Sequence, residues 1–184
     1  MANPNLLTDP PFAADPPVKV NVNAKVLGLV IGIVAVVLAV FGLLGLIAVF
    51  SACTIAGITV SGCGLPILWL LGSIVGLGGY IVAAIGGFRM YQLDREGKTY
   101  VIYGIALGVL GSLVYLIGNI IFYSGSLLSG YAVGYGGAIV FFIIGVLVDF
   151  VVYYMVVISR YPGEAPLVPT TGYGAPPPPP PPTV

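Results

Sequence analysis

Four long apolar stretches dominate this chain and leave it few ways to fold. They cover residues 26–50, 65–88, 101–123 and 133–158. A helix of about 20 residues crosses the ~30 Å hydrocarbon core of a bilayer, and each stretch exceeds that length. Charged residues make up only 7% of the sequence, against about 25% in soluble domains. The sequence therefore predicts an all-α integral membrane protein, an antiparallel four-helix transmembrane bundle.

The basic residues lie before the first stretch, between the second and third, or after the fourth. They are Lys19, Lys25, Arg89, Arg95, Lys98 and Arg160. The other two connections contain no Lys or Arg. Because cytoplasmic loops are enriched in these residues, we expect both termini and the central loop in the cytoplasm. The layout is common among small bacterial tetraspan proteins, so we expect a multi-pass protein of a bacterial plasma membrane.

Two proline-rich segments flank the apolar stretches. We expect residues 1–24 and 161–184 to be disordered cytoplasmic tails on either side of a membrane domain at 25–160. The second tail carries seven consecutive prolines of low complexity, which favour a polyproline II rod. Pro176, Pro179 and Pro182 are candidate positions for docking into an aromatic-lined groove of a partner. The simpler alternative is a stiff spacer.

Small residues recur at spacings of three and four in the second and third stretches. They are Gly72, Gly76, Gly79, Ala83 and Gly86, followed by Gly104, Gly108, Gly111 and Gly118. Such spacing places each set on one face of a helix, where small side chains let two backbones approach closely in lipid. We expect these faces to pack the two helices against each other, and Gly76→Leu to separate them. A homodimer interface is the alternative.

Cys53 and Cys63 lie in the connection between the first two stretches, on the expected outer side. That side is oxidising, so we expect a structural disulfide. A thiol oxidoreductase is the alternative, but such enzymes use a Cys-x-x-Cys motif and a second cysteine pair, which this chain lacks.

Asp149 is the one acidic or basic residue inside an apolar stretch, about 15 Å from its end. A carboxyl group at that depth is costly and is a functional candidate. Its expected neighbours at similar depth are Tyr80, Ser112 and Tyr153, with Asn119 farther along. We expect an interhelical hydrogen bond, and a proton or ion pathway is the alternative.

No reactive constellation accompanies these features. The chain has no histidine, and no pattern of residues typical of a nucleophile, a phosphate-binding loop, a metal site or a cofactor site occurs. The charged central loop predicts a solvated turn in which Gly97 assists the reversal. The six cations fall in three separate segments, which argues against nucleic-acid binding.

The leading hypothesis is a non-enzymatic accessory or scaffolding subunit of a larger membrane assembly. Its partners are the lipid bilayer and a membrane protein or a second copy of the chain. The alternative is a small proton or ion pathway through Asp149.

Overall fold

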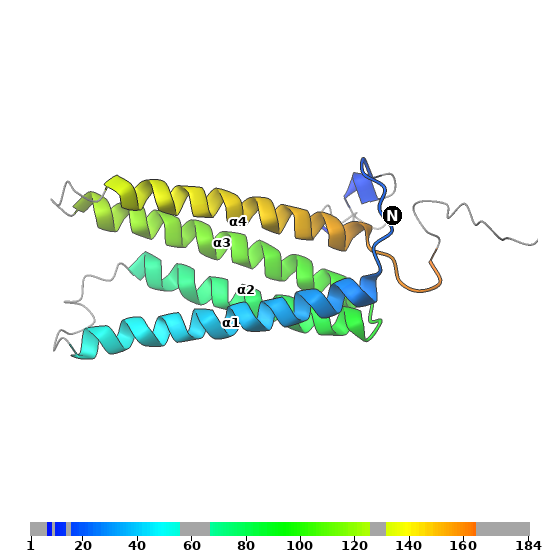
Figure 1. Cartoon of the computed structure of the whole chain (residues 1–184), viewed down its shortest axis with the longest axis horizontal. Helices are drawn as coiled ribbons and strands as arrows, with labels where there is room; N and C mark the ends of the chain where they lie inside the picture. The colour runs from blue at the N-terminus through cyan, green and yellow to red at the C-terminus, as the bar shows by residue number, and fades with distance from the viewer. Residues whose placement is uncertain (1–6, 9, 14–15, 56–66, 126–131, 165–184) are drawn as a thin grey trace, which may run out of the picture.

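The computed structural model describes residues 7–8, 10–13, 16–55, 67–125 and 132–164 (Figure 1). Most of them belong to four helices that lie side by side, each antiparallel to the next (Figure 1). The helices are α1 (Ala24–Ile55), α2 (Ile67–Tyr91), α3 (Glu96–Gly125) and α4 (Ala132–Ile158), and a short 3-10 turn, η1 (Pro11–Ala13), precedes them.

Each of the four helices contains a segment long and apolar enough to cross a membrane. These segments are Ala24–Ile47, Leu70–Tyr91, Glu96–Ile121 and Gly136–Ile158. The outside of the bundle is correspondingly apolar: Phe41 is 67% exposed and Phe141 is 77% exposed. A surface of this kind is stable in lipid and costly in water. The predicted all-α bundle of four membrane-spanning helices is confirmed, and the chain is a multi-pass membrane protein.

The helix bounds differ from the expected ones mainly at α1 and α3. Helix α1 continues to Ile55 and so includes Cys53, whereas the apolar pattern predicts an end at residue 50. Helix α3 begins at Glu96, five residues before the predicted start. Cys63 and the predicted disulfide lie outside the described residues, as do the candidate docking prolines Pro176, Pro179 and Pro182.

The α2–α3 pair forms the closest packing in the bundle, followed by α1–α2 and α3–α4. A Cβ added to Gly79 would lie 2.7 Å from the backbone nitrogen of Gly108, and one on Gly86 would lie 2.5 Å from that of Val101. Gly72 and Gly111 also meet backbone atoms of the opposite helix. These contacts are too close for any side chain, so glycine sets the distance between the two helices.

Gly76 and Gly108 lie differently from their neighbours on the same faces. A Cβ on either residue would meet no other atom within 4 Å. The Gly76 backbone still lies in the seam, because a Cβ added to Gly111 would stand 2.4 Å from the Gly76 nitrogen. A methyl group at Gly76 has open space, and the effect of the larger Gly76→Leu side chain stays a prediction. The glycines at which an added Cβ would strike the backbone of the opposite helix are Gly72, Gly79, Gly86, Gly97, Gly104 and Gly111.

A second seam of small residues joins α1 to α2. A Cβ on Gly28 would lie 2.5 Å from the Cβ of Met90, and one on Gly87 would lie 2.5 Å from the backbone nitrogen of Gly32. Gly28, Gly32 and Gly87 are all buried. Close backbone approach, as at the first seam, explains the choice of glycine.

The turn between α2 and α3 is only four residues long. Leu93 adopts a left-handed conformation (φ 68°), and the amides of Leu93 and Asp94 donate to the carbonyls of Met90 and Arg89. This pattern is a Schellman motif. The Asp94 carboxylate then accepts a hydrogen bond from the Glu96 amide (3.0 Å) and caps α3.

Gly97 does not assist the chain reversal, contrary to expectation. It lies in the first turn of α3, where an added Cβ would stand 2.5 Å from the backbone nitrogen of Met90. Its role is therefore close packing of α3 on α2.

The segment before α1 contacts the last turns of α4. Asn23 and Arg160 form a parallel β-bridge, and the Tyr154 hydroxyl donates to the Val18 carbonyl (2.8 Å). The Phe12 ring stacks on Tyr154 with centroids 5.8 Å apart. In the described residues of this segment, tyrosine hydroxyls thus satisfy main-chain groups that a free tail would leave to water, and the expectation of a disordered tail stays a prediction.

Candidate functional site

A cavity of about 510 Å³ opens between α1 and α4, the two helices that do not pack closely on each other. We call it the α1–α4 cavity. Its walls include Val34 of α1 and Val148 of α4, and its floor includes Ala83 of α2 and Gly104 of α3. Helix α4 packs mainly along α3 and meets α1 and α2 only near its C-terminal end, so this side of the bundle is open within the membrane-spanning region.

Three polar side chains interrupt the apolar lining of the α1–α4 cavity. They are Asp149 of α4, Tyr80 of α2 and Ser112 of α3. Asp149 follows Tyr80 by 69 positions in the chain and Ser112 by 37, yet all three side chains border the same cavity. The structure brings together three of the five polar residues that the sequence singles out.

Asp149 has no hydrogen-bond or ion-pair partner among the residues that the structure describes. The Ser112 hydroxyl instead donates to the Val109 carbonyl of its own helix (2.9 Å). A carboxyl group in an apolar environment without a partner is costly. The site is therefore incomplete as the isolated chain presents it.

The other two predicted polar residues lie away from Asp149. The Tyr153 hydroxyl donates to the Leu7 carbonyl (2.8 Å), so it holds the N-terminal segment on α4. The Asn119 side-chain amide donates to the Tyr115 carbonyl one turn earlier in α3 (3.0 Å). Neither residue extends a polar path from Asp149.

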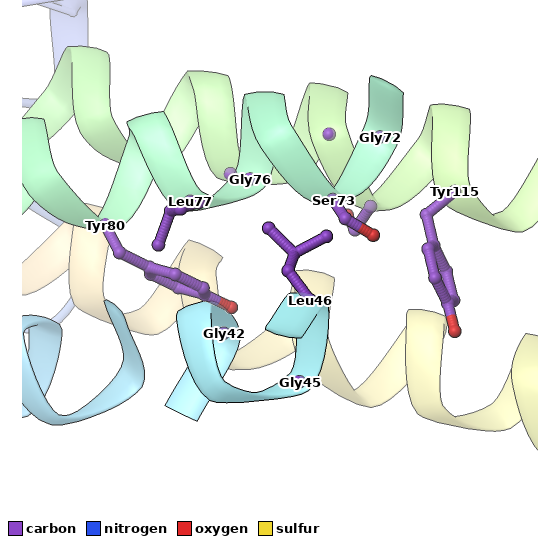
Figure 2. A pocket seen from close by; sticks show the side chains of 12 residues that line it. Gly42, Gly45, Leu46, Gly72, Ser73, Gly76, Leu77, Tyr80 and Tyr115 are labelled. Carbon is purple, nitrogen blue, oxygen red and sulfur yellow. The ribbon is translucent and has the colours of Figure 1, made fainter. Parts of the chain in front are cut away.

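A smaller cavity of about 390 Å³ lies among α1, α2 and α3, and we call it the glycine-lined cavity (Figure 2). Figure 2 shows Leu46 directed from α1 towards α2, between Tyr80 and Ser73. Six glycines border it: Gly42, Gly45, Gly72, Gly76, Gly108 and Gly111. Tyr80 and Ser112 border both cavities, so the two spaces meet at these side chains.

The charged end of the bundle forms the second notable region. Here the Tyr161 hydroxyl donates to the Asp94 carbonyl (2.8 Å), and Lys98 Nζ donates to the Ser159 carbonyl. Burial, together with the charges of Asp94 and Glu164, raises the pKa of Tyr161 to about 12. These contacts tie the α2–α3 turn to the end of α4.

The buried apolar core lies at this same end. Leu27, Met90, Val101 and Val156 pack there with Tyr161. From residue 136 to residue 155 of α4, by contrast, no side chain is fully buried. The bundle is therefore firmly packed where its charges gather and open where Asp149 lies.

The walls of the α1–α4 cavity were not predictable from the sequence. Residues such as Val34, Phe141 and Val148 belong to uniformly apolar stretches, in which no pattern separates a cavity wall from a lipid-facing surface. Asp149 could be identified from the sequence because it is a charged residue within an otherwise apolar stretch.

Within the described ranges, no three His, Cys, Asp or Glu side chains gather closely enough to hold a metal ion. Comparison of the chain with known protein families, curated proteins and solved structures finds no match.

Proposed function

We propose that the chain is a non-enzymatic accessory subunit of a larger membrane assembly, and that a transmembrane helix of its partner packs against the opening of the α1–α4 cavity and fills it with side chains. The observation that carries this proposal is the unpartnered carboxyl of Asp149 in an opening between two helices that do not pack on each other. A partner helix would complete the packing of α4 and supply a hydrogen bond to Asp149.

The physics of helix association in lipid favours this interpretation. Apolar burial gives little net attraction between helices there, so association depends on close packing at small residues and on interhelical hydrogen bonds. The cavity offers both, since Gly104, Gly108 and Gly145 border it beside Asp149. Acyl chains can fill such a space but cannot donate a hydrogen bond to a carboxyl group.

The orientation belongs to the same proposal. The start of α1, the α2–α3 turn and the end of α4, which carry all six cations, lie at one end of the bundle (Figure 1). The positive-inside tendency then puts this end, with both termini, in the cytoplasm. We assign the protein to a bacterial plasma membrane, in contact with lipid and a membrane partner and without a nucleic-acid partner.

Site-specific photo-crosslinking in the native membrane tests the docking side. A photoreactive residue at Val34 or Val148, on the walls of the cavity, should capture the same protein partner. Ile81 is the matched control, because it is 48% exposed, close to Val34 at 51% and Val148 at 55%, but does not line the cavity. Lipid adducts alone at all three positions would refute a partner in the cavity.

A proton or ion pathway through Asp149 is the second candidate. It is favoured by Tyr80 and Ser112, which share the cavity with the carboxyl group and connect it to the glycine-lined cavity. Asp149→Asn separates the two functions. Weakened assembly with no proton flux in wild-type proteoliposomes supports the accessory subunit, whereas intact assembly with lost flux supports the pathway.

A further inference from the structure

The fold gathers six cations that are dispersed along the sequence. Lys19 precedes α1 and Lys25 lies in its first turn, Arg160 follows α4, and Arg89, Arg95 and Lys98 lie in or beside the α2–α3 turn. Direct contacts join these segments: Arg95 pairs with Glu164 (3.8 Å), and Lys98 bonds the Ser159 carbonyl. The description of the cations as three separate segments thus holds for the sequence and not for the structure.

The carboxylates at this end neutralise only some of the cations. Arg89 forms ion pairs with Asp94 and Glu96 (3.8 and 3.2 Å), and Arg95 forms one with Glu164. Lys25 and Lys98 lie 5.2 Å from the ring centroids of tyrosines and form no ion pair with a described carboxylate. Lys25 and Lys98 thus keep their positive charges without a described carboxylate at ion-pair distance.

Arg160 is the most constrained member of this group. Its main chain is fixed on both sides, because its amide donates to the Val22 carbonyl and its carbonyl accepts from the Ala24 amide (both 2.9 Å). Its side-chain Nε is buried without a hydrogen-bond partner. The terminal guanidinium nitrogens have no described partner either, but they are not buried. The guanidinium is therefore held in place with its terminal groups open.

Lys98 reinforces the positive charge beside Arg160. Its ammonium group donates to the carbonyl of Ser159, the residue that precedes Arg160, and the charges of Glu164 and, less strongly, Arg160 act on it. Glu164 offsets part of the repulsion between the two cations, and a further anion close to both would offset more of it.

We propose that Arg160, with Lys98 beside it, binds the phosphate of an anionic phospholipid headgroup. Arg160 lies two residues beyond Ile158, the end of the fourth membrane span, which is the depth at which headgroup phosphates occur. A guanidinium matches phosphate oxygens in geometry and charge, and clusters of basic residues next to spans attract anionic lipids. The site is separate from the α1–α4 cavity and does not depend on the proposed partner.

Nanodiscs with and without phosphatidylglycerol in phosphatidylcholine test the site. Phosphatidylglycerol should raise the unfolding temperature of the wild-type protein, and native mass spectrometry should detect retained phosphatidylglycerol. Arg160→Gln should lower the apparent affinity for this lipid about fivefold, in proportion to one lost interfacial cation. Arg160→Lys should recover part of the loss, because lysine restores the positive charge but lacks the planar guanidinium that can donate two parallel hydrogen bonds to a phosphate.

Arg95→Gln is the matched control. It removes the same charge from a side chain that is 82% exposed and already paired with Glu164, so its affinity for the lipid should stay within about twofold of the wild type. If Arg160→Gln and Arg95→Gln lowered the affinity for phosphatidylglycerol equally, the lipid would be attracted by the general surface charge and not bound at a specific site. If inorganic phosphate stabilised the protein equally well in pure phosphatidylcholine, the bound phosphate group would not need to come from a lipid headgroup, and the proposal would be wrong. Should Arg160→Gln prove unstable, unchanged phosphatidylglycerol retention in Arg160→Lys and in Lys98→Gln would refute the proposal.

Discussion

Leu93 and Gly163 are the two described residues with positive φ, and they make opposite predictions. Leu93 (φ 68°) is 46% exposed, so Leu93→Gly removes backbone strain with little loss of contacts. We expect it to stabilise the fold by about 0.5–1 kcal/mol. Gly163 (φ 94°) has open space around an added Cβ, so Gly163→Ala should destabilise by about 1 kcal/mol through strain alone. Unfolding in mixed micelles measures both, and a shift of the same sign in the two variants would contradict the argument.

Tyr161 gives the pH dependence of the charged end. Its folded-state pKa of about 12 exceeds the ordinary value near 10, so the neutral phenol favours the folded state. This contribution is complete below about pH 10 and is lost as the pH rises through about 12. Tyr161→Phe should cost about 1 kcal/mol at neutral pH, through the lost bond to the Asp94 carbonyl.

The difference between wild type and Tyr161→Phe should accordingly shrink between about pH 10 and 12. Free energies of unfolding of both proteins in micelles across this range provide the measurement. A constant difference would show that Tyr161 ionises at the same pH in the folded and unfolded states.

The seams between helices provide a matched pair of glycine substitutions. Gly79→Ala places a methyl group 2.7 Å from the Gly108 nitrogen, and backbone cannot move aside cheaply. We expect it to lower the free energy of unfolding by about 1–3 kcal/mol. Gly76→Ala, three residues earlier, meets no atom within 4 Å and should be neutral or slightly stabilising. Thermal unfolding in nanodiscs compares the two, and equal effects would refute the assigned seam.

The sequence predicts where the helices lie in the chain better than it predicts which of their faces contact one another. Apolar length alone locates four spans, because a bilayer requires about 20 apolar residues in each. Spacing by three and four places Gly72 to Gly86 on one face, but it does not show at which of these positions a side chain would meet the opposite helix: an added Cβ would do so at Gly79 and not at Gly76. The pairing of Gly87 with Gly28 and Gly32 was not predicted, because it depends on which side of α2 receives α1.

The N-terminal segment marks another limit of the sequence. Its prolines and polar residues show no periodicity, so nothing in it indicates docking. Its contacts with α4 come from the hydroxyls of Tyr153 and Tyr154, which bond to the Leu7 and Val18 carbonyls. Such bonds depend on how the two ends of the bundle meet and not on a local pattern.

The whole molecule shows a division between its two ends. The charged residues and the buried core gather at one end, and the α1–α4 cavity with Asp149 lies in the open part of the bundle. The positions of the cations in the sequence predict that the charged segments lie on one side of the membrane, but not that the buried core lies beside them. It identifies Asp149 as a site but not the cavity around it, because the opening results from the absence of close α1–α4 packing.

The most direct test of the proposed accessory role is the native mass of the protein purified from its own membrane in a mild detergent. We predict a stoichiometric complex with another membrane protein, and its loss in Asp149→Ala while the purified variant keeps its helical content and unfolding temperature. A wild-type protein that runs as a lone monomer or homo-oligomer, with no stoichiometric partner, would contradict this account.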